Sequence, residues 1–265
     1  MLYRNGEYMK ILAIGDVVSS QGCEYLMKTL PALKREFGID LTIVNGENSA
    51  TGNGMHPKSA DFLLNCGADV ITGGNHTLKR REIYEYLDSS KPVIRPANLY
   101  RTAPGRGYEI IDMLKYKVGI INLIGVVYMD NNENPFDCAQ RLVKELKEKG
   151  CKIIIVDFHA EATGEKRALG YFLDGEVSAV FGTHTHVQTA DEQILPNSTG
   201  YITDIGMTGP VHSVLGVKVE LAIEKTKTNL PVRFETPDGE CRLEGCIFEI
   251  DEKTGKTINI TRIRR

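Results

Sequence analysis

The sequence predicts an α/β protein: a single domain with a mostly parallel sheet and a second, more antiparallel sheet. Two observations support this fold class. Short apolar runs alternate with helical patterns through the first two thirds of the 265 residues, which is the βαβ signature of a parallel sheet. Beyond residue 182 the segments become β-rich and are separated by Gly, Asp and Pro turns, which favours antiparallel hairpins.

Strand and helix patterns alternate along the first part of the chain. Each predicted strand is a short apolar run, and each predicted helix repeats its apolar residues at a spacing of three or four. The predicted order is strand 10–15, a helix carrying Leu26, Leu30, Leu33 and Phe37, strand 41–44, helix 57–67, strand 69–72 and a charged helix over 79–87.

The clearest helix spans 135–149, with Asn134 as its N-cap and Gly150 at its end. It leads into KIIIVDF (152–158), and VSAVFG (177–182) follows later. Both runs are apolar on both faces, as expected of central parallel strands. Further strands are predicted at 200–206, 230–235, 242–250 and 256–263, with turns at 237–240 and 255–257.

The composition is that of an ordinary globular protein, with a net charge of −3 and no dominant Lys/Arg cluster. This argues against a polybasic binder of nucleic acid or membranes. The apolar runs are far shorter than the roughly 20 residues that span a bilayer, and the first ten residues lack the apolar stretch of a signal peptide. We therefore expect a cytoplasmic protein with reduced cysteines. Residues 1–8 are interpreted as a disordered extension or the product of an upstream start codon, and 9–265 as one domain.

Side chains that bind metals or transfer protons follow the predicted strands. In an open α/β sheet the carboxyl ends of parallel strands share one edge, where ligands bind. Five strands of one such sheet would deliver these side chains to one place, and four of the six histidines lie at strand ends. The candidates are Asp16, Glu47, Asn48, Asn75, His76, His159, His184 and His186.

Each candidate taken alone also has an ordinary explanation. Asp16 after a strand is commonly a helix N-cap, and asparagines beside glycines are typical turn residues. A lone His159 is more often a hydrogen-bonded core residue than a ligand. Their joint position at strand ends is what favours a site. His56 and His212 are interpreted as loop residues, and Arg95 as a surface ion pair.

The stretch GTHTH places His184 and His186 two residues apart. In an extended segment such residues point to the same side, so both can face the crevice and serve two adjacent ions. Two-metal hydrolytic sites need a bridging carboxylate, for which Glu47 is the natural candidate. Imidazole, carboxylate and amide ligands without thiolate suit Fe, Mn or Zn rather than a cysteine-bound zinc, and three histidines disfavour magnesium or calcium cages.

The ordered motifs GD, GEN, GNH, FHAE, GTHTHVQTAD and ITDIGMTGP resemble the YmdB family of bacterial calcineurin-like metallophosphoesterases. The resemblance covers nearly the whole chain from Met9 and includes RPAN (95–98), FHAEATGEK (158–166) and TNLPVRF (228–234). It implies a four-layer α/β/β/α sandwich and a dinuclear phosphodiesterase. The associated substrates are 2',3'-cyclic nucleotides such as 2',3'-cAMP.

Carried over by position, the resemblance implies two sets of metal ligands that share Glu47. Asp16, Glu47, Asn48 and His186 would hold one ion, and Glu47, Asn75, His159 and His184 the other. In the implied mechanism a metal-bridging hydroxide attacks phosphorus, and His76 is the general acid that protonates the leaving oxygen.

Two other functions stay open at this point. The same metals could serve a phosphomonoesterase or nucleotidase. A regulatory or RNA-associated binding protein with a structural metal site is the rival from another class, although the acidic balance argues mildly against sequence-independent RNA binding. The sequence also leaves open whether the chain forms a homo-oligomer.

Overall fold

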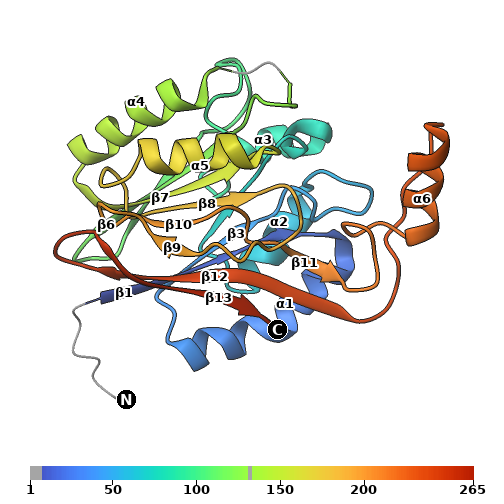
Figure 1. Ribbon diagram of the computed structural model, residues 1–265, viewed down its shortest axis with the longest axis horizontal. Coiled ribbons are helices and arrows are strands. Elements are labelled where there is room, and N and C mark those ends of the chain that lie inside the picture. Colours follow the sequence, from blue (N-terminus) through green and yellow to red (C-terminus); the bar gives the residue numbers. More distant parts are fainter. Residues whose placement is uncertain (1–7, 131–132) are drawn as a thin grey trace.

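Two β-sheets form the framework of the protein (Figure 1). The computed structural model describes residues 8–130 and 133–265. The strands of the first sheet are β1 (Tyr8–Ile14), β2 (Asp16–Val17), β3 (Leu41–Asn45), β4 (Val70–Thr72), β11 (Met207–Pro210), β12 (Cys241–Asp251) and β13 (Thr257–Arg264). Their order is β2-β11-β12-β1-β3-β4, with β13 paired to β12, and β1, β3 and β4 run parallel.

The second sheet contains the long apolar runs that the sequence assigns to central parallel strands. Its strands are β5 (Tyr108–Asp112), β6 (Lys117–Ile124), β7 (Cys151–His159), β8 (Ala179–Thr183), β9 (Gln193–Ile194) and β10 (Gly200–Ile202). The order is β5-β6-β7-β8-β10-β9, and β6, β7, β8 and β10 are parallel. The predicted mixed α/β fold with two sheets is therefore confirmed.

Helices cover the outer faces of these sheets. As predicted, Asn134 caps its helix, because its side chain accepts a hydrogen bond from the Phe136 amide. The helices α4 and α5 lie on one face of the second sheet, whereas α6 stands clear of the body (Figure 1). Their bounds are α1 (Ser19–Phe37), α2 (Pro57–Asn65), α3 (Tyr84–Leu87), α4 (Pro135–Glu148), α5 (Thr163–Phe172), α6 (Val219–Thr228), and the 3₁₀ turns η1 (Thr77–Lys79) and η2 (Arg81–Ile83).

Three apolar clusters hold the elements together. Leu26 and Leu30 of α1 pack on one face of the first sheet. A second cluster, which includes Ile11 and Phe181, joins the inner faces of the two sheets. The third joins Leu142 of α4 and the residues around α5 to the second sheet. Burial of apolar side chains stabilises the folded state by about 25 cal/mol per Å² of buried surface. The close-packed contact between the sheets therefore fixes the positions of the strand ends and of the loops that follow them.

Three predicted elements are wrong in part. The helix predicted over 79–87 is helical only from Tyr84, because extended backbone at Arg80 separates two 3₁₀ turns. The Arg80 guanidinium donates to the carbonyls of Thr51 and Asn53, a tertiary contact that overrides the helical pattern.

The segment 230–235 is not a strand. It has no strand partner among the described residues, and Leu230 and Phe234 are exposed. An alternating pattern forms a strand only where the edge of a sheet is available for backbone hydrogen bonds, and no described strand pairs with this segment. The region 200–206 contributes β10, which pairs parallel with β8 rather than forming only antiparallel hairpins. The predicted hairpin turn at 255–257 does connect β12 to β13.

Three smaller features concern the N-terminus, the cysteines and the helices. The extension predicted over 1–8 lies outside the described residues, except for Tyr8, which opens β1. All six cysteines are free. No helix in the described ranges is long and apolar enough to cross a membrane.

Candidate metal centre

The predicted site residues come together where the carboxyl ends of strands from both sheets meet. In the first sheet, Asp16 opens β2 just after β1, and Glu47 follows β3. In the second sheet, His159 ends β7 and His184 follows β8. The prediction that five strands of one sheet supply the site is therefore wrong. Because the facing sheets are packed through a shared core, their ends converge. These side chains form one cluster, which we call the metal centre after the role that the sequence predicts for it. Its members are Asp16, Glu47, Asn48, Asn75, His159, His184 and His186.

Glu47 lies between two groups of side chains. Its Oε1 accepts a hydrogen bond from Asn48 Nδ2 at 2.9 Å, and Asn48 Nδ2 lies 3.3 Å from His186 Nε2. The nearest Asp16 oxygen is 3.7 Å from the same His186 nitrogen. These distances bring together the four residues of the first predicted set.

The second group lies on the other side of Glu47. Glu47 Oε2 is 3.4 Å from His159 Nε2, and that nitrogen is 2.9 Å from Asn75 Oδ1 and 3.0 Å from His184 Nδ1. Ligand atoms of Glu47, His159 and His184 all lie within 4.8 Å of one another. This spacing fits one divalent ion, so the residues of the second predicted set also converge.

The outer nitrogen of each histidine in the centre has its own partner. His184 Nε2 lies 3.0 Å from Glu161 Oε2, His186 Nδ1 is 2.9 Å from the Leu215 carbonyl, and His159 Nδ1 is 2.9 Å from Thr183 Oγ1. When the outer nitrogen donates its proton, the inner nitrogen keeps its lone pair. All three imidazoles are thus oriented as metal ligands usually are.

Two further features fit a bound cation. Asp16 is fully buried, and its Oδ1 has no hydrogen-bond partner among the described residues. Gly74 leaves room at the centre, because a Cβ there would lie 2.3 Å from Glu47 Oε2 and 2.4 Å from His159 Nε2. A buried carboxylate oxygen without a partner is costly to stability, and a divalent ion is the partner that this donor set accommodates.

Charges in the centre shift pKa values in opposite directions. Burial raises the pKa of Glu47, but the neighbouring His159 and His76 outweigh burial and lower it to about 2. Burial lowers the pKa of His159, yet the carboxylates, Glu47 foremost, raise it to about 9. Burial and the adjacent His159 lower the pKa of His184 to about 3. His184 is therefore neutral at pH 7 and free to ligate.

His76 lies at the rim of the centre. Its amide donates to Glu47 Oε2 at 2.9 Å, and its Nδ1 lies 2.8 Å from Asn48 Oδ1. The ring is part exposed, and burial lowers its pKa even though Glu47 opposes the shift. Nδ1 is thus tied to Asn48, which leaves Nε2 as the nitrogen for a substrate.

The backbone around His184 and His186 is not extended, which corrects the argument that led to these residues. Both have positive φ, at 100° and 61°, a region that non-glycine residues rarely adopt. A buried ion pair, Lys166–Asp204, holds this loop in place; Lys166 Nζ lies 2.7 Å from Asp204 Oδ2. Lys166 Nζ also donates to the Thr183 carbonyl, and Asp204 Oδ2 accepts from Thr185. Strained backbone held in this way is typical of functional loops.

Arg95, interpreted from the sequence as a surface ion pair, is instead buried. Its guanidinium donates to the backbone carbonyls of Pro96, Ala97, Ala103 and Pro104. His56 caps α2, where its Nδ1 accepts from the Lys58 amide. Gly74 and the Lys166–Asp204 pair could not be identified from the sequence. The lack of space for a Cβ at Gly74 and the pairing of two buried charges are seen only in the three-dimensional structure.

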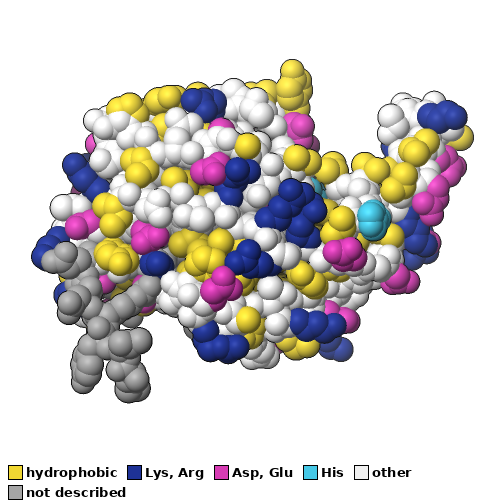
Figure 2. All heavy atoms as spheres, turned by 60° about the horizontal axis from the view of Figure 1, so that its bottom comes forward, with side chains coloured by type: hydrophobic (Ala, Val, Ile, Leu, Met, Phe, Trp, Pro, Cys, Tyr) yellow, Lys and Arg dark blue, Asp and Glu magenta, His cyan; other side chains and the backbone are white. Residues whose placement is uncertain are grey.

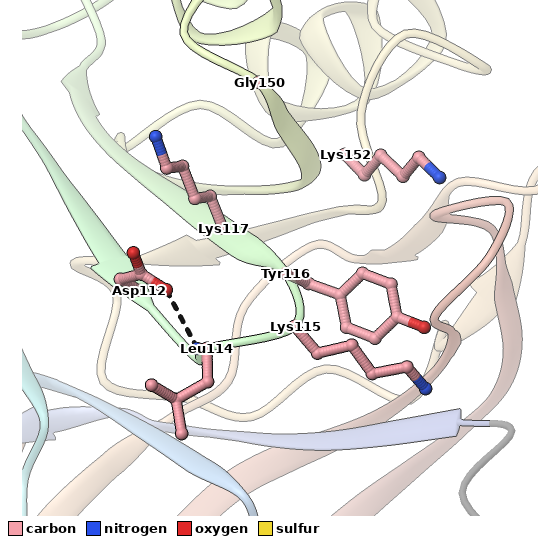
Figure 3. A pocket seen from close by; sticks show the side chains of 7 residues that line it. All are labelled: Asp112, Leu114, Lys115, Tyr116, Lys117, Gly150 and Lys152. Atoms are coloured by element: carbon pink, nitrogen blue, oxygen red, sulfur yellow. Dashed lines mark hydrogen bonds between the residues drawn. The ribbon is translucent and has the colours of Figure 1, made fainter.

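A basic pocket of about 320 Å³ lies away from the metal centre (Figure 3). Lys115, Lys117 and Lys152 line it at the amino ends of β6 and β7. The strand β7 is nine residues long, so its two ends are about 25 Å apart. The lysines are therefore remote from His159.

The chain is similar to known proteins over nearly its whole length. The family model described as "YmdB-like protein" matches residues 12–263. The 2',3'-cyclic-nucleotide 2'-phosphodiesterase of Bacillus subtilis (strain 168) is 45% identical over 96% of this chain and 96% of its own. The crystal structure of a novel phosphatase from Mycoplasma pneumoniae superposes with a TM-score of 0.91 at 36% identity, covering 97% of this chain and 93% of that one.

A more distant similarity concerns the fold alone. The 5'-nucleotidase precursor of Thermus thermophilus has a TM-score of 0.58 at 13% identity. The similarity covers 97% of this chain and 54% of that one. The fold is thus shared with a longer protein.

Proposed function

The chain belongs to the YmdB-like family, and from this we propose that it hydrolyses small phosphodiesters, with 2',3'-cyclic nucleotides as the substrate class. Membership confirms the predicted enzyme class, a metallophosphoesterase. The proposal extends to the four-layer α/β/β/α sandwich, to a single domain over 9–265 and to two divalent ions, Fe or Mn, with Zn as the alternative. The observation that carries it is the position of Glu47 between two groups of ligands.

The residues of the centre would divide into two ligand sets that share Glu47. Asp16, Asn48 and His186 belong to one, and Asn75, His159 and His184 to the other. Divalent ions held there would supply Lewis-acid polarisation of the phosphoryl group and would lower the pKa of water towards 7. The lowered pKa values of Glu47 and His184 keep these side chains ready to bind cations at neutral pH.

His76 is the proposed general acid. The tie between its Nδ1 and Asn48 Oδ1 orients the ring, and Nε2 then presents a proton to the leaving oxygen. Burial lowers the pKa of His76, which favours the neutral ring, so the ring must gain a proton on Nε2 before it can act as the acid. Asn48 in this scheme both ligates and positions the acid.

The direct test compares a diester with a monoester. With Mn²⁺ present, we expect bis-p-nitrophenyl phosphate to be hydrolysed faster than p-nitrophenyl phosphate, and 2',3'-cAMP faster than 3',5'-cAMP. A clear preference for the monoester would instead support the second candidate, a phosphomonoesterase, which the name of the Mycoplasma relative favours.

Two predictions about partners stay untested. The face shown in Figure 2 carries interspersed Lys/Arg and Asp/Glu side chains rather than one basic field, so RNA association is not part of the proposal. A homo-oligomer stays a prediction. The α6 helix, which buries no residue and exposes Val219 and Ile223, is the element to examine for it.

A further inference from the structure

A buried polar cluster joins the two sheets directly beneath the metal centre. It consists of Asn45 on β3, Thr72 on β4, Asp157 on β7 and Thr183 on β8, each 1% exposed or less. The loops after β3, β4 and β8 carry residues of the centre, and β7 itself ends at His159. The four side chains thus lie at the point where two strands of each sheet approach one another.

Asp157 is the hub of this cluster. Its Oδ2 accepts from Thr72 Oγ1 at 2.5 Å and from Asn45 Nδ2 at 3.3 Å, and its Oδ1 accepts from Thr183 Oγ1 at 2.7 Å. A buried carboxyl group in an otherwise apolar interface is costly, and an apolar residue of similar volume would commonly be more stable there. Its presence therefore calls for a role other than stability.

The hydroxyl of Thr183 transmits the effect of Asp157 to His159. A hydroxyl has one proton, and Thr183 gives it to Asp157 Oδ1. Thr183 Oγ1 can then only accept from His159 Nδ1, which lies 2.9 Å away. The neutral His159 ring thereby keeps its proton on Nδ1, and Nε2 faces Glu47, Asn75 and His184.

We propose that Asp157 and Thr183 are positioning residues that fix the tautomer and ring orientation of His159 for metal binding. The proposal deepens the proposed function, because it rests on His159 being a metal ligand. The other two histidines of the centre are held by a surface carboxylate and a backbone carbonyl. His159 alone among them relies on a buried relay that also ties β3, β4, β7 and β8 together.

The test measures metal affinity directly, in the metal-free full chain titrated with Mn²⁺. Thr183→Val removes the hydroxyl and keeps the shape, and we expect Mn²⁺ to bind about 10- to 100-fold more weakly. Thr183→Ser keeps the hydroxyl and should restore most of the affinity. Asp157→Asn should weaken Mn²⁺ binding in the same direction, because the amide cannot accept at both positions.

Thr42→Val is the matched control. Thr42 is a fully buried strand threonine whose hydroxyl has no hydrogen-bond partner among the described residues. It should leave Mn²⁺ affinity unchanged. Equal affinity in the Thr183→Val and Thr42→Val variants would overturn the proposal, and so would equal losses in the Thr183→Val and Thr183→Ser variants.

A second measurement needs no variant. In the Zn²⁺-loaded protein with ¹⁵N-labelled histidine, we expect the His159 ring to carry its proton on Nδ1 and the metal on Nε2. A proton on Nε2 would contradict the relay even if every variant failed to fold. Failure of the proposed function would look different, since the relay could hold in a protein that binds metal and hydrolyses no phosphodiester.

Discussion

Glu47 lies between the two groups of side chains in the metal centre. It contacts Asn48, the His76 amide and His159, and its pKa of about 2 keeps it ionised over the whole range in which the protein would work. Residue types and their places after strands sufficed to find it from the sequence. The residues that orient its neighbours could not be found in that way, because Asp157 and Thr183 occupy ordinary strand positions.

Replacing His76 by Ala tests the assignment of the general acid. Because His76 supplies a proton and is not a proposed ligand, we expect kcat to fall about 10²- to 10⁴-fold with metal content unchanged. His212→Ala, at an exposed position, is the control. Loss of bound metal from the His76 variant, measured by elemental analysis, would move this residue into the ligand set.

Gly74→Ala tests the space at the centre. The added Cβ would collide with Glu47 and His159, so we expect weaker metal binding and a loss of roughly 1–3 kcal/mol in stability from overpacking. Gly164→Ala on α5 is the matched control, because a Cβ there meets no atom within 4 Å. Indistinguishable metal affinities for the two variants would show that the space is not needed.

At the level of elements, the loop after β8 differs most from its sequence prediction. The pattern GTHTH predicts an extended segment, and the structure has a tight loop with two histidines at positive φ. The buried Lys166–Asp204 pair compensates for the strained backbone by holding Thr183 and Thr185. The local sequence pattern predicted the long strands and α4 correctly. The conformation of 79–87 depends on the tertiary contacts of Arg80, and 230–235 is not a strand because it has no strand partner among the described residues.

Lys166→Met tests this brace. The change leaves Asp204 buried without its partner, so we expect a loss of about 3–5 kcal/mol in the free energy of unfolding, measured by urea titration. Lys147→Met removes a lysine whose side chain is 45% exposed in its pair with Glu176, and should cost under about 1 kcal/mol. Similar losses in the two variants would contradict the structural role of the buried pair.

In the whole molecule, two sheets meet at the metal centre. They are held together by their shared apolar core and by the buried polar cluster around Asp157. The site residues and the main strands could be predicted from the sequence, but the pattern alone assigns them all to the edge of one sheet. Periodicity indicates which runs are buried; it does not indicate which sheet each strand joins. The family resemblance implied a four-layer α/β/β/α sandwich. Of this arrangement, the structure shows two sheets packed together through a shared apolar cluster.

Removing bound metal should therefore lower the stability of the whole fold. An ion present at 100 times its Kd stabilises the folded state by about 2.7 kcal/mol. For a chain of this size we expect EDTA treatment to lower the Tm by about 5–10 °C. Mn²⁺ should restore it, whereas an unchanged Tm with and without chelator would indicate that the centre binds no cation in the folded protein.

The most direct test of the account is an anomalous difference map from crystals grown with Mn²⁺. We predict two peaks per chain, about 3.5–4 Å apart, with a Glu47 oxygen between them. Asp16, Asn48 and His186 should surround one peak, and Asn75, His159 and His184 the other. A single peak, or two peaks that do not share Glu47, would contradict the two-ion centre.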